Sequence, residues 1–316
     1  MFAGIAIGTG RVRTMCKDRY RDYLADRKAV YDGAMPDHAR NPSIEGQARG
    51  TMAAAPHCTA IVLAGQRPGV DPVANHFGAT SKSLVRVAGE AMLARVARTL
   101  LRTPAINEVV LLAQDIECQL ADSDLAWLRD HDRVTPRVSG GTISGSVLEA
   151  FAQIRPGWPV LVTTADNVFV SQSLVTEMLE AEGDHDLAIG FVERWRVEKA
   201  CGPCSRTWLR FRDGEFTGAN LFLFRSPAAL DALQFWMKVE QDRKSFRKMA
   251  ARFGPVLLLL LLTRRLTLAE ALVRAGQRLG VKVRPVLLSD GKAGVDVDKV
   301  SDHALAERLL AGDAPL

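Results

Sequence analysis

The amino-acid sequence predicts a three-layer α/β fold with a mostly parallel central sheet. Short, continuous apolar runs recur along the chain, as buried parallel strands require. Segments in which apolar residues recur at helical spacing separate most of these runs. Polar turns that contain glycine join the two kinds of segment. This alternation is typical of βαβ units, in which a helix returns the chain to the start of the next parallel strand.

The predicted strands and helices follow one another in a regular order. In the first predicted helix, Leu93, Val96, Ala97 and Leu100 share one face. The leucine run 256–262 is far shorter than the ~20 residues that span a bilayer, so it is interpreted as a buried helix segment. The predicted strands are 59–63, 109–112, 160–163, 187–192, 220–224 and 281–287, and the predicted helices are 90–102, 144–154, 173–181, 230–239 and 266–279.

The domain organisation is predicted to be one domain with an extension. Residues 1–52 read as a loose N-terminal extension, because residues 1–51 mix Gly, Arg, Asp and Pro without apolar periodicity. Met52 is a candidate native start, since the first strong strand follows it closely. Residues 53–316 are predicted to form the functional domain.

Charge and cysteine content exclude several classes of function. The net charge is +5, but residues 1–51 carry +3 of it. The sequence has no basic stripe with interleaved aromatic residues, so a nucleic-acid partner is not expected. Five cysteines are too few and odd in number for a disulfide framework. Cys201 and Cys204 have CxxC spacing without a second pair or a histidine pair, so a tight turn is favoured over zinc or redox chemistry, and their role is left open. No membrane span or secretion signal is visible, so the cytoplasm is the expected location.

The first candidate site lies where the first strand ends. The chain leaves this strand through residues 63–69 (LAGQRPG), and Lys82 follows in the sequence SKSL. Ligands of open α/β sheets bind outside the carboxyl ends of the strands, and glycine lets the backbone approach phosphates there. Arg67 and Lys82 could neutralise a triphosphate. A tight turn with two solvated cations is the alternative interpretation of the same pattern.

The second candidate site is the end of the third predicted strand. The apolar run 160–163 leads through Thr164 and Ala165 to Asp166. A carboxylate at a strand tip can hold a metal over a bound triphosphate, and neighbouring Thr and Asn side chains add polar atoms. Asp166 could instead cap the following helix.

These motifs resemble those of the NTP-transferase family, which includes molybdenum-cofactor guanylyltransferase-like proteins, sugar-phosphate nucleotidyltransferases and cytidylyltransferases. The resemblance rests on the Leu-Ala-Gly strand end, the later Lys before Leu, and the segment 87–93 (VAGEAML), and it extends to about residue 310. It implies a Rossmann-like, GT-A-like nucleotide-diphospho-sugar transferase fold. Gln66 departs from the family pattern, in which a second glycine is common, and the loop before Lys82 is long.

The resemblance also implies roles for residues further along the chain. Segment 294–302 (GVDVDKVSD) resembles a family stretch whose first aspartate is the second metal ligand, which points to Asp298, with Asp296 on the same face as an alternate. Asp302 is expected to cap the last helix. Segment 139–147 resembles a Gly-Gly…Ser-Val stretch that contacts base and ribose in the cytidylyltransferases, although a flexible loop with a serine cap is an equal interpretation.

Together these motifs predict a nucleotidyltransferase that moves NMP from an NTP to a phosphorylated acceptor, with Mg²⁺ and release of pyrophosphate. CTP is slightly favoured, GTP comes next, and the acceptor and oligomeric state are left open. Two carboxylates that share a metal repel each other, so the empty site is expected to be strained. The predicted catalytic residues are Arg67 and Lys82, the nucleotide-binding residues Leu63, Ala64, Gly65, Arg67, Lys82, Gly140, Gly141, Ser146 and Asp166, the metal ligands Asp166 and Asp298, and the acceptor-binding residues Asn220, Arg243, Lys244 and Lys248.

Two other functions fit part of the pattern. A GT-A-type glycosyltransferase would share the fold but would have Asp-x-Asp at the strand end, where this chain has Thr164-Ala165-Asp166. A non-catalytic NTP-binding regulatory module would fit Gln66 and the long loop. The joint presence of Lys82, Asp166 and Asp298 argues against such a module.

Overall fold

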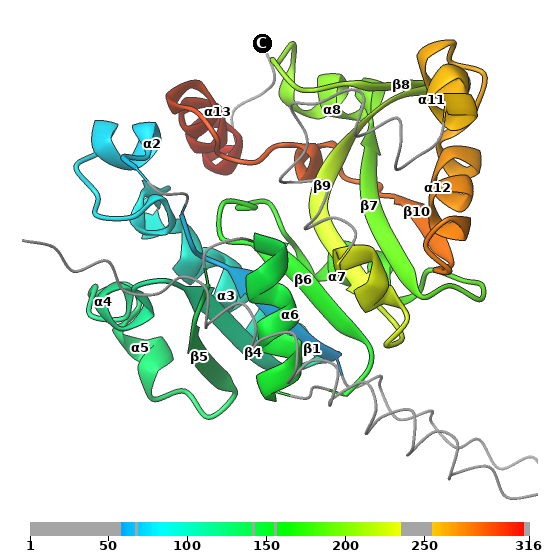
Figure 1. Cartoon of the computed structure of the whole chain (residues 1–316). Coiled ribbons are helices and arrows are strands. Elements are labelled where there is room, and N and C mark those ends of the chain that lie inside the picture. Colours follow the sequence, from blue (N-terminus) through cyan, green and yellow to red (C-terminus); the bar gives the residue numbers. More distant parts are fainter. Residues whose placement is uncertain (1–57, 67–68, 141–142, 155–156, 235–254, 313–316) are drawn as a thin grey trace, which may run out of the picture.

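Residues 58–66, 69–140, 143–154, 157–234 and 255–312 are described by the computed structural model (Figure 1). The predicted extension, residues 1–52, lies outside these ranges, so its separation from the domain stays a prediction. Within the described residues, no helix combines the length and apolar character needed to cross a membrane.

An eight-stranded sheet forms the centre of the described structure. Its strand order is β10-β7-β9-β6-β1-β4-β5, with β8 paired to β9. The strands are β1 (Cys58–Leu63), β4 (Ile106–Ala113), β5 (Val134–Val138), β6 (Val160–Thr164), β7 (Leu187–Glu193), β8 (Leu209–Phe211), β9 (Gly214–Phe224) and β10 (Val283–Leu287), and a small hairpin of β2 (Arg86–Val87) and β3 (Glu90–Ala91) stands apart.

Most pairs in the sheet are parallel, as the sequence predicts. Strand β1 pairs in parallel with β4 and with β6. The pairs β4–β5 and β7–β10 are also parallel. The carboxyl ends of β1, β4 and β6 therefore meet at one edge of the sheet. Strand β9 is antiparallel to both β6 and β7. Because β9 runs the other way, its middle, around Asn220, lies beside the tip of β6.

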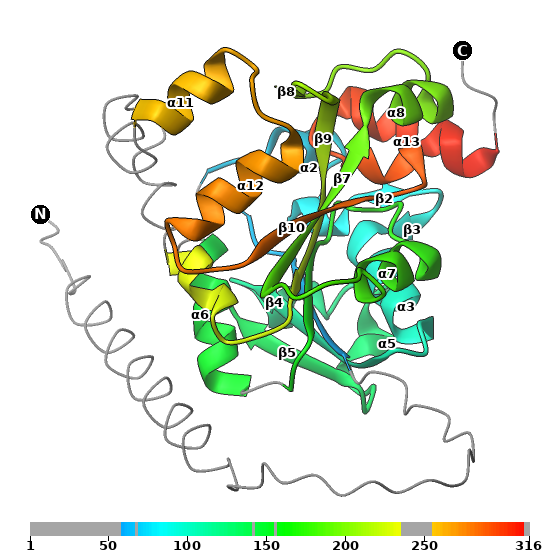
Figure 2. The same cartoon turned by 90° about the vertical axis from the view of Figure 1, so that its right-hand side faces the viewer.

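Helices cover both faces of the sheet and give the three predicted layers (Figure 2). Along β1, Ala60 and Val62 pack into the core that contains α3 and α7, whereas Ile61 packs into the core that contains α6. Burying each large apolar side chain contributes about 1.5–3 kcal/mol. The helices are α2 (Pro72–His76), α3 (Met92–Arg102), α4 (Ile116–Gln119), α5 (Ala126–Arg129), α6 (Ile143–Ile154), α7 (Gln172–Leu179), α8 (Arg194–Cys201), α11 (Pro255–Leu262), α12 (Leu268–Gln277) and α13 (Val300–Ala311), with 3₁₀ turns η1 (Lys82–Leu84) and η2 (Gly291–Gly294).

The structure contains elements that the sequence prediction omits. Strand β5 has proline in its middle and leaves Val138 66% exposed, as suits the last strand at an edge of the sheet. Helix α8 has a polar sequence without a clear apolar stripe. The predicted helix 230–239 runs beyond the described residues. The run 256–262 does form a helix, α11, but Leu259 and Leu262 are 61% and 67% exposed, so the interpretation of this run as fully buried is wrong for the described residues.

Candidate active site

Three of the predicted site residues meet at the edge of the sheet where β1 and β6 end. The ammonium nitrogen of Lys82 lies 2.5 Å from Oδ2 of Asp166 and 2.6 Å from Oδ1 of Asp298. Because both oxygens contact one nitrogen, they are no more than about 5 Å apart. At that separation, both carboxylates can coordinate one ion.

Asp166 is positioned by the tip of β6. The backbone N–H of Ala165 donates to the carbonyl of Leu63 at 3.0 Å, which extends the β1–β6 pairing one step beyond the strand. The Thr164 hydroxyl then donates to Oδ1 of Asp166 at 2.5 Å. The buried amide of Asn167 donates to Thr163 Oγ1 and to the carbonyl of Ala219 on β9. The Asp166 carboxylate is therefore held at a strand tip, with Oδ2 left to face Lys82.

Lys82 is the first residue of η1, and its neighbours fix the turn. The Ser81 and Ser83 hydroxyls are 2.7 Å apart, and both side chains are buried. Gln119 of α4 accepts from the Ser83 hydroxyl at 2.9 Å, and its amide donates to Ser81 Oγ and to the carbonyl of Ala64. One buried glutamine thus links the lysine turn to the end of β1. Sequence reasoning missed Gln119, because nothing in its four-residue helix indicates a contact with a segment 36 positions earlier.

Asp298 lies between η2 and α13, in a segment tied directly to the tip of β6. The N–H of Val297 donates to the carbonyl of Asp166 at 3.2 Å. Asp302, in the first turn of α13, accepts from the N–H groups of Asp298 and Lys299 at 3.1 and 3.0 Å. The last helix begins at Val300 with Lys299 as its N-cap, so the prediction that Asp302 begins this helix as its cap is wrong: Asp302 lies in the first turn, and its carboxylate holds the backbone of Asp298.

Asp296, the alternate metal ligand in the sequence prediction, is engaged elsewhere. Its carboxylate pairs with Arg206, and Asn220 Nδ2 donates to its Oδ2 at 3.0 Å. Burial, and then the negative charges of Asp298 and Asp166, raise the pKa of Asp296 to about 6, although Arg206 acts to lower it. The carboxylate that contacts Lys82 is that of Asp298, and its role as a metal ligand stays a prediction.

The charges of the site stabilise one another. Burial would lower the pKa of Lys82, but the nearby Asp166 and Asp298 carboxylates outweigh it and hold the pKa above its ordinary value. Burial would likewise raise the pKa of Asp298, but the ammonium of Lys82 outweighs burial and lowers it. Lys82 and Asp298 therefore stay charged at neutral pH. This arrangement corrects the expectation of a strained pair of carboxylates, because the Lys82 ammonium lies between them.

The described residues at this edge suit a hard divalent cation. The carboxylates of Asp166, Asp296, Asp298 and Asp302 outnumber the cations Lys82 and Arg206 there. Carboxylate oxygens are the ligands that Mg²⁺ prefers, and the ion commonly takes one or two of them together with phosphate oxygens. Within the described ranges, no group of three or more His, Cys, Asp or Glu side chains could hold a metal on its own. Phosphate oxygens or water would have to complete the coordination.

The glycine-bearing loop after β1 is held by a residue that the sequence prediction omits. Gln114, directly after β4, accepts from the N–H of Gln66 at 3.0 Å and donates to the carbonyl of Gln66 at 3.0 Å. A Cβ added at Gly65 would lie 2.8 Å from Gln114 Oε1, so a side chain there would displace the end of Gln114 that holds Gln66. Leu63, Ala64 and Gly65 lead into this loop as predicted, whereas Arg67 lies outside the described residues.

Gln114→Ala is expected to raise the KM for NTP about tenfold and to change kcat much less, because two hydrogen bonds of about 1 kcal/mol each are lost from the loop. Steady-state kinetics at varied NTP concentration would measure this. Gln172→Ala is the matched control, since Gln172 is an exposed glutamine whose amide donates to one carbonyl far from the site. An unchanged KM in Gln114→Ala would remove the loop from nucleotide binding.

Other predicted site residues are placed less completely. Gly140 and Ser146 flank the start of α6, and a Cβ at Gly140 would lie 3.8 Å from Ser146 Oγ, so they are close neighbours. Asn220 contacts Asp296, which puts it at the same edge of the sheet as Asp298, and its predicted contact with an acceptor is untested. Gly141, Arg243, Lys244 and Lys248 lie outside the described residues.

The CxxC pair lies beside Arg206. Cys201 is buried at the end of α8, the chain turns at Gly202 with a φ of 72°, and both thiols are free. Burial raises the pKa of Cys201 to about 12 and also raises that of Cys204. Thiols of this kind are poor nucleophiles at neutral pH. The turn that the sequence favours is present, and the pair gains no reactivity from its surroundings.

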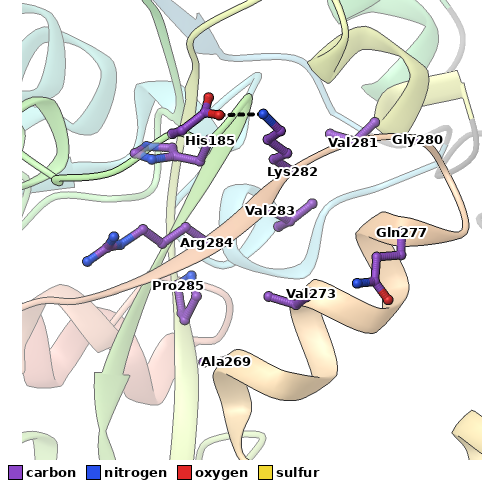
Figure 3. Close-up of a pocket in the computed structure, with 11 residues that line it drawn as sticks. His185, Ala269, Val273, Gln277, Gly280, Val281, Lys282, Val283, Arg284 and Pro285 are labelled. Carbon is purple, nitrogen blue, oxygen red and sulfur yellow. Dashed lines mark hydrogen bonds and ion pairs between the residues drawn. The ribbon is translucent and has the colours of Figure 1, made fainter.

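The described residues also form a recess of about 680 Å³ (Figure 3). It runs beside β10, which borders the sheet, and the exposed side of α12. Lys282 pairs with Asp184 there, and burial, followed by the charge of Arg225, lowers the pKa of His185. The recess shares no residue with the site built on Lys82, Asp166 and Asp298.

Comparison with known proteins agrees with this geometry. Residues 60–280 match the family of MobA-like NTP transferase domains. A hypothetical transferase from Thermus thermophilus has 29% sequence identity and a TM-score of 0.64, and the match covers 79% of this chain and 100% of that one. Curated protein sequences gave no match.

Two synthases are more distant structural neighbours. A 4-diphosphocytidyl-2C-methyl-D-erythritol synthase from Anaerococcus prevotii has 12% identity and a TM-score of 0.48, covering 81% of this chain and 97% of that one. A further structure of a synthase with this name has 15% identity and a TM-score of 0.48, covering 82% and 99%. At this degree of similarity, nothing about the substrate of this chain follows from them.

Proposed function

This chain belongs to the family of MobA-like NTP transferase domains, and from that premise we propose that it transfers NMP from an NTP to a phosphorylated acceptor with Mg²⁺. The observation that carries the proposal is the convergence of Asp166 and Asp298 on Lys82 at the ends of β1 and β6. In open α/β sheets, this edge is where ligands bind.

The reaction is a displacement at the α-phosphorus. An oxygen of the acceptor phosphate forms a bond to this phosphorus, the bond to the bridging oxygen breaks, and pyrophosphate leaves with the electron pair. The acceptor phosphate is already ionised at neutral pH, so the protein need not remove a proton. Positioning and charge neutralisation supply most of the catalysis in phosphoryl chemistry of this kind.

Each residue of the site has a role in this reaction. Lys82 places a positive charge that can move from the carboxylates to the triphosphate. The loop that begins at Gly65, held by Gln114 through both backbone groups of Gln66, would let the backbone come close to phosphate oxygens. Asp166 and Asp298 would hold Mg²⁺, which supplies charge neutralisation on the phosphates when bound. Arg67 is proposed as a further cation at the triphosphate, as the sequence pattern suggests.

Binding of the four NTPs, each with and without Mg²⁺, tests this function. Thermal shift needs no acceptor, and pyrophosphate release measures turnover once a candidate acceptor is added. We expect one NTP, with CTP or GTP favoured, to raise the Tm in the presence of Mg²⁺ and little in its absence. Four NTPs that leave the Tm unchanged would contradict the proposal.

Nucleotide sugars in the same experiment test the glycosyltransferase alternative. Such an enzyme would bind a sugar nucleotide with a metal at an Asp-x-Asp strand end, and Ala165 and Thr164 precede Asp166 here. A Tm increase with nucleotide sugars but not with NTPs would favour that activity. NTP binding without any pyrophosphate release across a panel of phosphorylated acceptors would favour a regulatory module.

A further inference from the structure

A buried arginine holds the segment that carries Asp298. Arg206 lies between α8 and β8, and its side chain is only 7% exposed. Its guanidinium pairs with the Asp296 carboxylate, donates to the Asp296 carbonyl at 2.9 Å, and lies 3.5 Å from Oδ1 of Asp302. A planar guanidinium can contact two carboxylates and a carbonyl at once, which a lysine cannot reproduce.

The two acidic partners of Arg206 lie on either side of Asp298. Asp296 precedes it by two positions, and Asp302 accepts from the N–H groups of Asp298 and Lys299. Arg206 itself lies 90 positions before Asp296 in the sequence. The arginine therefore connects both ends of the short segment whose middle residue contacts Lys82.

Asn220 makes the second contact on Asp296, from an unusual backbone conformation. The pairing of β7 with β9 shifts register between Ile189 and Phe191, and Asn220 lies in the irregular part of β9 with a φ of 49°. Bulges of this kind redirect side chains near functional sites. Asparagine tolerates this conformation better than most residues do. From β9, its amide donates to Oδ2 of Asp296 at 3.0 Å.

We propose that Arg206 is a positioning residue that fixes the Asp298 carboxylate opposite Asp166, with Asn220 as its helper. The functional half of this proposal rests on the proposed nucleotidyl transfer. Four carboxylates, those of Asp166, Asp296, Asp298 and Asp302, gather at this edge, and their mutual repulsion would push the Asp298 segment outward. Arg206 and Asn220 draw Asp296 back, while Asp302 holds the backbone of Asp298. Asp298 is then the carboxylate that faces Lys82.

Arg206→Lys tests this arrangement, because it keeps the charge and removes the planar fork. Hydrogen exchange followed by mass spectrometry should show faster exchange at the N–H groups of Val297, Asp298 and Lys299. In steady-state kinetics, kcat should fall about 10²-fold, the scale of a small misplacement, while the KM for NTP stays within about twofold. Arg210→Lys is the matched control, since Arg210 is half exposed and pairs with Glu215.

Asn220→Gly distinguishes two roles for the contact between Asn220 and Asp296: positioning of Asp298, or restraint of Asp296 as a metal ligand. Glycine accepts the positive φ, so the change removes the amide contact without backbone strain. If Asn220 helps to position Asp298, the glycine variant binds Mn²⁺ several-fold more weakly and exchanges faster at residues 297–299. If Asp296 is itself a metal ligand that Asn220 restrains, Mn²⁺ binds at least as tightly as in the wild type, and the proposal is overturned.

Failure of this proposal can be told apart from failure of the proposed function. Unchanged exchange at residues 297–299 in Arg206→Lys would overturn the positioning role whatever the enzyme does. Faster exchange with unchanged kcat and KM would overturn the link to catalysis. If the wild-type protein transfers no nucleotide, the proposed function fails, and exchange and Mn²⁺ affinity still decide whether Arg206 fixes this segment.

Discussion

Asp166→Asn is expected to lower the kcat of nucleotidyl transfer by about 10³-fold, because an amide cannot hold a divalent cation over the triphosphate as a carboxylate does. The change keeps the shape of the side chain and its place at the tip of β6. Pyrophosphate release at saturating NTP and Mg²⁺ measures the effect. The Tm increase that Mg²⁺ with NTP gives the wild-type protein should also be lost.

The stability of the Asp166→Asn protein follows from the position of Lys82. Two bare carboxylates would repel, and removing one charge would then stabilise the metal-free protein. Lys82 lies between them instead, so the variant loses one ion pair of a largely buried lysine, and the free energy of unfolding should fall by about 1 kcal/mol.

Asp132→Asn is the control for this prediction, because Asp132 is 90% exposed and remote from the described site residues. A substituted protein that retains a tenth of the wild-type turnover would remove Asp166 from the metal site. A clear gain in Tm would show that repulsion outweighs the ion pair with Lys82.

Lys82→Ala is expected to lower the rate of catalysis and to strengthen metal binding by the nucleotide-free protein. Turnover should fall about 10²-fold, as for the loss of one charge contact in a transition state. Without nucleotide, however, the variant should bind Mn²⁺ about tenfold more tightly than the wild type, because the ammonium that contacts both carboxylates competes with the ion. Electron paramagnetic resonance of free Mn²⁺ would measure this affinity directly.

This prediction implies that the metal enters the wild-type site together with the nucleotide. The triphosphate offers Lys82 a new partner, and the two carboxylates then become available. Lys282→Ala is the matched control, because Lys282 also pairs with an aspartate, Asp184, but lies beside the separate recess. Equal Mn²⁺ affinity in Lys82→Ala and wild type would show that the ammonium does not occupy the position of the metal.

The fold class could be predicted because it depends on local patterns. Continuous apolar runs such as 59–63 and 160–163 become buried strands, and the polar residues that follow them lie at one edge of the sheet, since parallel strands share their direction. The position of Asp166 at that edge follows from this rule, whereas the turn that carries Lys82 is placed by Gln119. The antiparallel direction of β9 could not be predicted in this way, because an apolar run has the same composition whichever way it enters a sheet.

Long-range contacts account for the rest of the site. The sequence treats Asp296 and Asp298 as equivalent residues of one strand, and the family pattern alone pointed to Asp298. The structure has no strand at residues 295–298, so that strand parity is wrong. In the folded chain, Arg206 and Asn220 hold Asp296, and Lys82 contacts Asp298 across 216 positions. No local pattern around these residues encodes such partners, because each contact depends on where the sheet brings distant segments together. The apolar run 160–163 thus predicts that Asp166 reaches the sheet edge, the family pattern pointed to Asp298, and packing across the sheet brings both carboxylates to Lys82.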